Sequence, residues 1–499
     1  MKRIFIGNNA RTLLFIFVVV LAVRLLITFQ TPSFSTSESY FTLRQVENIK
    51  ENGLPIYNDA ISYSGRQLIF LPFFYYLVSM LTFFLPTIAA AKILVNIISA
   101  CTIFPVYLIT KKLTSDRKVA LFTAFASGFI PLYFSLTINS ISPTVLFVPL
   151  MLLFIYFFMD LEKKKSLYFL ILAFFVILIS STSVIIIVIG MLLYMLLAKL
   201  EHLNQRREEA EVILFLTFVT FWLMFLLFKD VFLFHGISFI WRNIPDTLLN
   251  KFFVSLNVAE LIVKIGIIPF IYGLYIIYKY VFRSKDKNIY LLISFTLSIL
   301  IMIWLKLLEF NLGVILLSIL LTIMFGRGFK LTLNYLARTK FSKYENLVIL
   351  LLFFIFLFNS VWPAFTYSID EVGNSFTPAE IEAYKWLQSN TNNQSIVIAS
   401  TAEGHLITYY GKRKNVIDSN FILVPNINQR YEDIDQLYRA FSLTEAINLI
   451  TKYKANYILV SPRAKEEFNT TELKYVEDPC FNLTYNNQIK IYQSLCEIK

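Results

Sequence analysis

Apolar runs close to the length that crosses a bilayer recur along this chain from Thr12 to Pro363. Hydrophobic residues make up 57% of the chain and charged residues only 16%, and a soluble protein of 499 residues cannot bury so much apolar surface. The sequence therefore predicts a polytopic α-helical membrane protein with about eleven transmembrane helices. We expect the spans near residues 12–29, 88–110, 119–137, 143–159, 167–180, 183–198, 212–228, 260–282, 288–305, 309–325 and 345–363.

One further apolar run, residues 68–86, decides the topology. If it lies in or dips into the outer leaflet, the basic clusters between the spans all fall on one side, together with Lys2, Arg3 and Arg11. Basic loops mark the cytosolic side. We therefore expect a multi-pass protein of the cell membrane with a cytoplasmic N-terminus, an outer loop over 30–87 that includes a juxtamembrane helix at 68–86, and an external C-terminus. The clusters lie at 111–118, 163–165, 199–207, 283–287 and 326–343.

Charge divides the chain into two predicted domains. Residues 364–499 hold 13 Lys and Arg against 16 Asp and Glu, whereas the whole chain has a net charge of +12. The basic excess therefore lies within residues 1–363, on loops that face anionic membrane lipid. We expect a transmembrane domain over 1–363 and an extracytoplasmic domain over 364–499. No basic soluble domain is present, so a nucleic-acid partner has no support.

Strand-like and helical segments alternate in residues 364–499, which predicts a small α/β domain. The segment from Thr377 to Ser389 begins T-P-A-E, with proline in the first turn, and predicts a capped helix. Cys480 and Cys496 bracket a predicted hairpin over 481–495, and a disulfide between them is favoured over free thiols. The other expected elements are strands at 395–400, 415–418 and 456–461 and helices at 403–411 and 443–455.

Three N-x-S/T sequons occur, at Asn393, Asn469 and Asn482, and all lie in this second domain. They are candidate glycosylation sites. The alternative is chance, because the chain is rich in asparagine.

The loop after the first span and the C-terminal domain carry the chain's most informative motifs. The loop reads E-S-Y-F-T-L-R at 38–44, G-L-P-I-Y-N-D at 53–59 and F-L-P at 70–72. The C-terminal domain reads S-T-A-E-G at 400–404 and Y-Y-G at 409–411, and Arg413 is followed by Asp418.

Together with the layout, these motifs resemble the GT-C glycosyltransferases, and among them the catalytic subunit of oligosaccharyltransferase and its archaeal relatives. That family's loop reads like D-S-Y-Y-H-L-R, G-x-P-x-Y-D and Y-P-P, and its tail like W-W-D-Y-G, a tyrosine-rich helix and R-x-x-x-x-D. The resemblance implies a membrane enzyme that transfers sugars from a polyprenyl-phosphate carrier. It also implies that Glu38 acts as the catalytic base and that Tyr40 contacts substrate.

The chain departs from these motifs at three points. Glu38 stands where the family has an Asp, residues 139–142 hold no acid where the family has a second acidic motif, and residues 400–404 lack both Trp residues. The acceptor is therefore expected to differ and to be a protein, a glycan or a lipid. A divalent cation, Mg²⁺ or Mn²⁺, would depend on Glu38, Asp59 and water as ligands.

Sugar transfer from a lipid phosphate needs a base, a cation that offsets charge on the departing phosphate, and a groove for the lipid. Glu38 is the predicted base, and the alternative is a solvated loop acid or a helix cap. Snorkelling or interfacial anchoring is the alternative for the candidate cations. These cations are Lys92, Arg242, Lys306 and Arg413.

Further candidate substrate contacts lie in the loop and in the C-terminal domain. Arg44, Asp59 and Arg66 come from the loop, and Glu403 and His405 come from the position of the family's acceptor motif. The alternatives are ion pairs within the loop, such as Asp59 with Arg66 or Glu47 with Arg44 or Lys50, and surface packing for His405.

The leading function is thus an inverting glycosyltransferase on the outer face of the membrane. The alternative is a non-catalytic GT-C-like protein that binds lipid-linked glycan or scaffolds a membrane complex. A transporter ranks last, because the spans show few of the broken helices and mid-membrane charges that transporters use.

Overall fold

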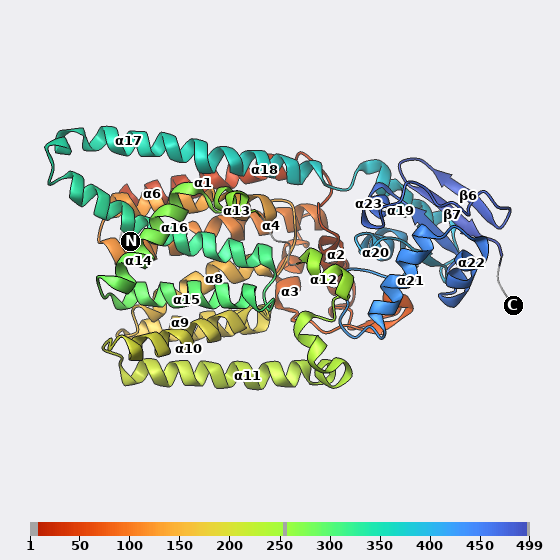
Figure 1. The fold of residues 1–499 in the computed structure, drawn as a ribbon, viewed down its shortest axis with the longest axis horizontal. Helices are drawn as coiled ribbons and strands as arrows, with labels where there is room; N and C mark the ends of the chain where they lie inside the picture. The colour runs from red at the N-terminus through yellow and green to blue at the C-terminus, as the bar shows by residue number, and fades with distance from the viewer. Residues whose placement is uncertain (1–7, 253–256, 497–499) are drawn as a thin grey trace.

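The protein consists of a helical bundle with a smaller sheet domain at one end (Figure 1). The computed structural model describes residues 8–252 and 257–496. Within this part of the chain, six helices are long and apolar enough to cross a membrane, or seven if one bent pair forms a single span. The predicted polytopic membrane protein with a C-terminal α/β domain is confirmed, but the expected number of eleven spans is not.

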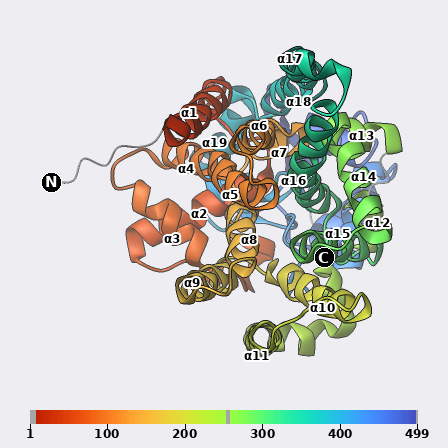
Figure 2. The same ribbon diagram turned by 90° about the vertical axis from the view of Figure 1, so that its left-hand side faces the viewer.

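The long apolar helices differ in how much of their surface the rest of the protein covers. α16 is almost wholly buried, whereas α11 and α17 lie at opposite edges of the bundle and are mostly exposed (Figure 2). Such exposed apolar helices are stable only when lipid covers them. The long helices are α1 (Asn8–Thr28), α4 (Thr87–Cys101) continued by α5 (Ile103–Thr114), α11 (Arg207–His235), α15 (Lys287–Trp304), α16 (Phe310–Leu336), and α17 (Glu345–Phe356) continued by η4 (Leu357–Val361) and α18 (Trp362–Gly373).

Two predicted spans are broken, which the apolar pattern does not reveal. The run at 119–137 forms two helices because Pro131 has no N–H to donate and holds Ile130 in an extended conformation. The run at 260–282 bends by 97° at Gly266, whose φ of +100° suits glycine alone. The shorter bundle helices are α6 (Arg117–Gly128), α7 (Pro131–Leu136), α8 (Thr144–Phe158), α9 (Lys164–Ser180), α10 (Val184–Leu200), α13 (Val258–Ile265) and α14 (Ile267–Phe282).

The polar loop after α1 is itself folded. It forms α2 (Ser37–Asn52), which ends at Gly53 in the left-handed conformation, then a two-stranded ribbon, and then α3 (Phe73–Leu81). The helix expected over 68–86 is therefore shorter, because Pro72 precedes it and a turn at 82–85 leads to Pro86. The ribbon strands are β1 (Asn58–Asp59) and β2 (Arg66–Gln67), with η1 (Ser62–Ser64) between them.

The C-terminal domain is built on a sheet with strand order β4-β3-β5-β7-β6. β3 is parallel to β4 and β5, and the final hairpin adds β7 and β6 antiparallel to β5. The strands are β3 (Ile396–Ile398), β4 (Lys414–Asn415), β5 (Tyr457–Val460), β6 (Phe481–Asn486) and β7 (Lys490–Ser494). The strand expected at 415–418 is thus only two residues long and starts one residue earlier.

Helices cover this sheet, and the predicted helix at 377–389 is observed as α19 with a capping box. Thr377 accepts a hydrogen bond from the Glu380 N–H, and Glu380 accepts one from the Thr377 N–H. The sequence did not predict α21, because polar residues outnumber the few apolar residues that form its buried face. The helices are α19 (Pro378–Asn390), α20 (Gly404–Leu406) with η5 (Ile407–Gly411), α21 (Ile427–Arg439), α22 (Leu443–Lys452) and α23 (Pro462–Glu467).

Two segments of the bundle hold the sheet domain in place. Tyr40 of α2 lies in a buried cluster with Phe376 and Tyr409. On the other side, the segment of η2 (Gly236–Trp241) and α12 (Asp246–Phe252) inserts Leu248 into the core of the sheet domain. The connection from α18 is a continuous helix from Trp362 through to Gly373, so the domain boundary at residue 363 stays a prediction.

Cys480 and Cys496, the pair expected from the sequence, are joined by a disulfide that closes the β6–β7 hairpin. Asn393, Asn469 and Asn482 are all exposed, which keeps them candidates for glycosylation.

We expect Cys480→Ala/Cys496→Ala to lower the free energy of unfolding by about 3 kcal/mol, because the disulfide closes a loop of 16 residues. Thermal unfolding of the purified full chain measures this loss. Cys101→Ala is the matched control, since Cys101 is a free thiol in α4. Equal stability of the double variant and the wild type would contradict the prediction.

Candidate active site

The first turn of α2 presents Glu38 at the end of the bundle nearest the sheet domain. Ser37, Ser39 and Tyr40 on either side of it are buried, whereas Glu38 is exposed. Thr36 and Ser39 share a hydrogen bond of 2.7 Å that fixes this turn. Glu38 forms no hydrogen bond or ion pair with any residue in the described ranges, and it lies in the first turn of α2. It is therefore available to a substrate.

A second carboxylate, Glu309, lies close to Glu38. Glu309 precedes α16, in the short turn that follows α15. Burial raises the pKa of Glu309, the positive charge of Arg242 opposes the shift, and the negative charge of Glu38 adds to it. Glu38 and Arg242 are therefore near enough to Glu309 for their charges to act on it. The residue surface of Glu309 is nonetheless exposed, although many protein atoms surround its carboxyl group.

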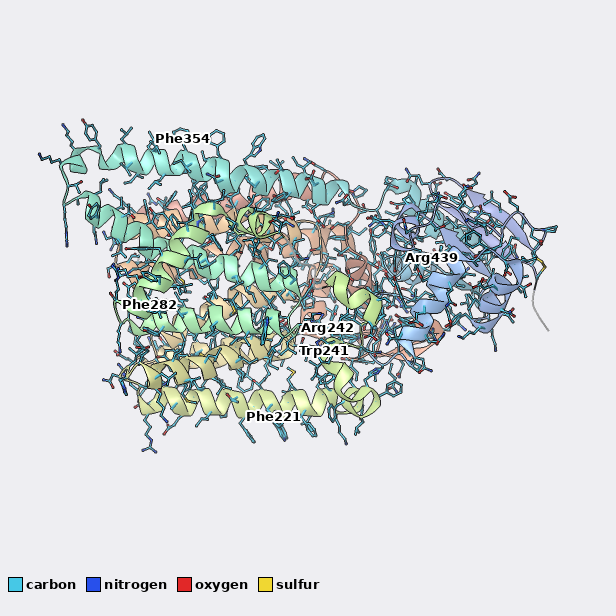
Figure 3. The ribbon with its side chains drawn as sticks, in the orientation of Figure 1. Phe221, Trp241, Arg242, Phe282, Phe354 and Arg439 are labelled. Carbon is cyan, nitrogen blue, oxygen red and sulfur yellow. A yellow bond between two sulfur atoms is a disulfide. The ribbon has the colours of Figure 1, made fainter. Side chains whose placement is uncertain are left out.

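Arg242 reaches this site from the η2–α12 segment. Arg242 and Asn243 both have φ of 54°, in a turn that Asn243 fixes by donating to the carbonyls of Phe421 and Val424 at 2.9 and 3.1 Å. Figure 3 shows Arg242 where the bundle meets the sheet domain. Lys306 is exposed in the turn before Glu309, with φ of 56°. Two of the four predicted cations therefore lie near Glu38 or Glu309.

The sheet domain contributes His405 and Asp418 to the other side of Glu38. His405 is buried, with its ring 5.3 Å from that of Phe41 and Nε2 3.8 Å from Asp418. Burial lowers the pKa of His405, while the charges of Asp418 and Glu38 oppose that shift. His405 is buried rather than packed on the surface, and its contact with an acceptor stays a prediction.

Asp418 is the centre of a network that ties the loop to the sheet domain. It is fully buried, accepts from Arg66 Nη2 at 3.1 Å and from Ser62 Oγ at 2.6 Å, and also accepts from the Asn420 N–H. Burial alone would raise the pKa of Asp418, but Arg66, His405 and these hydrogen bonds lower it. Arg66, a predicted substrate contact, is thus occupied by a buried ion pair.

The loop ion pairs differ from those expected. Arg44 binds both carboxylate oxygens of Asp59 at 2.7 Å, and Asp59 also accepts from the Ile61 and Ser62 N–H groups. Burial would raise the pKa of Asp59, but Arg44 and these N–H groups lower it. Because both oxygens of Asp59 are engaged, Asp59 does not fit the predicted metal site. The described residues contain no group of three or more His, Cys, Asp or Glu side chains that could hold a metal ion.

Four other predicted contacts have structural partners. Tyr40 is fully buried, and its hydroxyl accepts from the Phe34 N–H. Lys92 is buried and donates to the carbonyls of Thr28 and Thr31 at 2.7 Å, so it does not snorkel. Arg413 closes the C-terminal end of α19 through the carbonyls of Gln388 and Thr391. Glu403 is buried and accepts from Tyr384 and Ser400 at 2.6 Å.

The sequence therefore identified Glu38, Arg242, Lys306 and His405 as candidates near the site but gave too little weight to Glu309 and Asp418. The available signals were weak. Glu309 stands three residues after Lys306 in a short connection between two apolar spans, and Asp418 ends the R-x-x-x-x-D motif. The roles of all these residues in substrate binding stay predictions.

We expect Gly404→Ala to destabilise the sheet domain by about 1–3 kcal/mol or more, because an added Cβ would lie 2.1 Å from the Ile417 carbonyl oxygen and 2.7 Å from the Asp418 Cα. Backbone atoms cannot turn away as side chains do, so His405 and Asp418 would move apart. Thermal unfolding measures the loss, and Gly411→Ala is the control, since its nearest contact would be an ordinary 3.4 Å. Equal stability of the two variants would contradict the argument.

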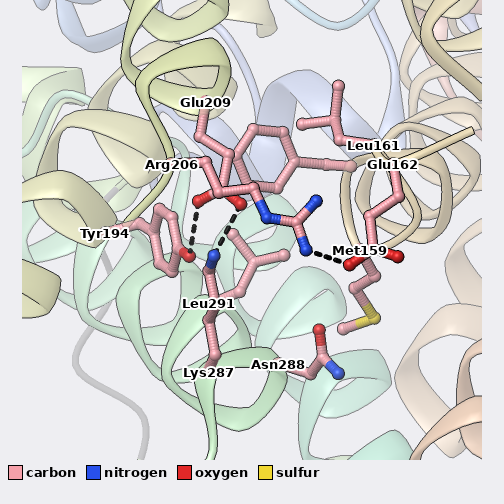
Figure 4. Close-up of a pocket in the computed structure, with 10 residues that line it drawn as sticks. Met159, Leu161, Glu162, Tyr194, Arg206, Glu209, Lys287, Asn288 and Leu291 are labelled. Atoms are coloured by element: carbon pink, nitrogen blue, oxygen red, sulfur yellow. Dashed lines mark hydrogen bonds and ion pairs between the residues drawn. The ribbon is translucent and has the colours of Figure 1, made fainter. Parts of the chain in front are cut away.

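The other end of the bundle holds a polar cavity of about 180 Å³ that differs from the Glu38 site (Figure 4). Lys287 begins α15, whereas Glu309 lies beyond the far end of that helix. In the cavity Arg206 pairs with Glu162, and Glu209 accepts from both Lys287 at 2.5 Å and Tyr194 at 3.4 Å. Its charges therefore join helices to one another and do not belong to the Glu38 site.

Comparison with solved structures identifies the fold. The chain superposes on the Archaeoglobus fulgidus oligosaccharyltransferase in its apo form with a TM-score of 0.73 at 14% identity, covering 92% of this chain and 70% of that one. The same archaeal enzyme in complex with an inhibitory peptide and a dolichol-phosphate gives 0.73 at 14% identity, with 91% and 69% covered. ArnT from Cupriavidus metallidurans bound to undecaprenyl phosphate gives 0.56 at 10% identity, with 95% and 97% covered.

No protein-family profile and no curated protein sequence matches the chain. At such low identity the three superpositions establish the fold alone. The fold is that of the GT-C membrane glycosyltransferases, as the loop and tail motifs predict.

Proposed function

We propose that this protein transfers a sugar or oligosaccharide from a polyprenyl-phosphate-linked donor to an acceptor on the outer face of the membrane. One observation carries the proposal. Glu38 is exposed and without an ion pair among the described residues, at the junction of the bundle and the sheet domain, with Arg242 and Glu309 beside it. An accessible carboxylate without an ion-pair partner suits general-base chemistry.

The reaction is a displacement at the anomeric carbon. Glu38 accepts the proton of the acceptor hydroxyl or amide, and the acceptor atom forms a bond to the anomeric carbon. The bond from that carbon to the phosphate oxygen breaks, and the lipid phosphate leaves with the electron pair. Because the acceptor attacks the face opposite the phosphate, the configuration of the anomeric carbon is inverted. Arg242 offsets the negative charge that grows on the departing phosphate.

Glu309 complements Glu38 because the pKa of Glu309 is raised by burial and by the charge of Glu38. Glu309 is therefore a second carboxyl group near the proposed base, in the short turn before α16.

The donor class is supported by what two proteins of this fold bind. The archaeal oligosaccharyltransferase binds a dolichol-phosphate, and ArnT binds undecaprenyl phosphate. Both ligands are polyprenyl phosphates, which combine a phosphate group with a long hydrocarbon chain. Because neither Trp of the acceptor motif is present at 400–404, we propose that the acceptor differs from the asparagine sequon.

A non-catalytic role in binding lipid-linked glycan or in scaffolding is the second candidate, and Asn139 favours it. This residue begins the stretch 139–142 where the family has an acidic motif, and its side chain donates to Ser375 Oγ at 2.7 Å and accepts from Thr28 Oγ1 at 3.3 Å. Such a neutral replacement would be expected in a chain that binds donor without turning it over.

The two functions separate in a transfer assay with the purified full chain in proteoliposomes. The donors are labelled sugars on dolichol-phosphate and on undecaprenyl phosphate, and the acceptors are a membrane protein extract, free glycans and lipids. Release of the lipid phosphate together with a labelled acceptor supports the enzyme. Saturable donor binding without release would overturn the catalytic proposal and support the second function.

A further inference from the structure

An amphipathic groove lies at the end of the bundle opposite Glu38. It has a volume of about 760 Å³ and runs between the α5–α6 turn, the last turns of α16 and the first half of α17. The α5–α6 turn forms where Ser115 adopts the left-handed conformation with φ of 54°. No step of the proposed sugar transfer uses this groove, so a ligand bound there would differ from the donor and the acceptor.

The polar side of the groove carries unpaired positive charge. Asp116 is the acid of the lining, and it is satisfied by Lys330 Nζ at 2.6 Å and by the Lys118 and Val119 N–H groups, which it caps. Arg117 and Lys118 are exposed, and neither side chain has an ion pair with a residue in 8–252 or 257–496. Once Lys330 has neutralised Asp116, the mouth of the groove keeps two positive charges.

The opposite side of the groove is apolar and faces the membrane. Phe122 of α6 lies 5.3 Å from Phe329 of α16 and 6.3 Å from Phe353 of α17, measured between ring centroids. α17 belongs to a span that is mostly exposed, so lipid is its neighbour along much of its length. The groove therefore has a cationic mouth at the end of the helices and an aromatic wall that runs toward the bilayer interior.

We propose that this groove binds one anionic phospholipid. Its headgroup phosphate contacts Arg117 and Lys118, and an acyl chain lies against Phe122 and Phe353. Charge complementarity selects an anion, and the apolar wall selects an anion that carries a hydrocarbon chain. The lipid would fasten α17 to α6 and α16, far from Glu38, so the proposal holds whether or not the protein transfers sugars.

Native mass spectrometry of the full chain, delipidated in detergent, tests the proposal with added phosphatidylglycerol and phosphatidylcholine. We expect one phosphatidylglycerol to bind in preference to phosphatidylcholine, and Arg117→Gln/Lys118→Gln to weaken that binding about 10- to 30-fold. Lys164→Gln/Lys165→Gln is the control, since these exposed lysines at the start of α9 lie outside the groove and should leave binding unchanged.

Each other outcome overturns the proposal. Equal binding of the two lipids would show that the headgroup is not recognised, and equal loss in both double variants would show only general attraction to basic residues. Protection from thermal unfolding by inorganic phosphate as strong as that by phosphatidylglycerol would identify a site for a free anion. Thermal unfolding of Arg117→Gln/Lys118→Gln without lipid tests whether the variant is folded. We expect the same transition as in the wild type, because both substituted side chains are exposed.

Discussion

Glu38→Gln should reduce sugar transfer by about 10²- to 10⁴-fold, the contribution that a positioned general base makes. Glutamine keeps the size of the side chain but cannot take up the acceptor's proton. Because Glu38 has no hydrogen bond or ion pair within the described part of the chain, the change breaks no contact, and we expect the thermal unfolding transition to stay where it is. The rate of release of the lipid phosphate from a labelled donor measures the effect.

Glu51→Gln is the matched control for this prediction. Glu51 is an exposed glutamate in the last turn of the same helix, so its substitution removes the same charge from α2 but away from the site. We expect Glu51→Gln to leave transfer within about twofold of wild type, since an exposed charge distant from the site acts only through screened interactions. Equal activity of the Glu38 and Glu51 variants would remove Glu38 as the base.

The sequence predicted the membrane bundle because apolar runs of bilayer length leave few alternatives. It failed where a local backbone feature divides a run. Pro131 and Gly266 each break a continuous apolar segment into two helices, and the hydropathy of the segments reveals neither break. In the C-terminal domain, the capped helix from Pro378 and the strands at β3 and β5 have strong local signals, whereas α21 depends on packing against the sheet.

For the site, the sequence supplied the motif position of Glu38 but not the burial of the other candidates. Three charged candidates lie within an apolar run or a motif: Lys92, Arg413 and Glu403. In the sequence, such a residue cannot be told apart from a functional group. Most of their partners are carbonyls and hydroxyls from other segments of the chain, such as Thr28 for Lys92. Hydrogen bonds of that kind follow from tertiary folding and leave no trace in local spacing.

Asp418→Asn should destabilise the junction between the loop and the sheet domain by about 3–5 kcal/mol, because it leaves the guanidinium of Arg66 buried without its counter-charge. The side chains of Arg66 and Asp418 are 3% and 0% exposed, so water cannot replace the lost partner. We expect the melting temperature of the purified full chain to fall by on the order of 10 °C. Asp435→Asn is the control, since its pair with Arg439 is largely exposed and worth at most about 0.5 kcal/mol.

The same ion pair predicts how stability depends on pH. The folded pKa of Asp418 is lower than the usual value of 3.8, so its contribution is present above pH 3.8 and is lost as pH falls through the folded pKa. His405 acts in the same direction, because its lowered pKa makes the unfolded chain take up a proton first as pH falls below 6.5. Asp418→Asn removes the carboxylate and with it the loss below pH 3.8, so the variant should be less stable than the wild type at neutral pH and approach it only below pH 3.8, since losing the Asp418 charge also lowers the pKa of His405 further. Parallel melting curves for the two proteins from pH 7 down to pH 3 would contradict this assignment, because a purely steric effect of the substitution would not depend on pH.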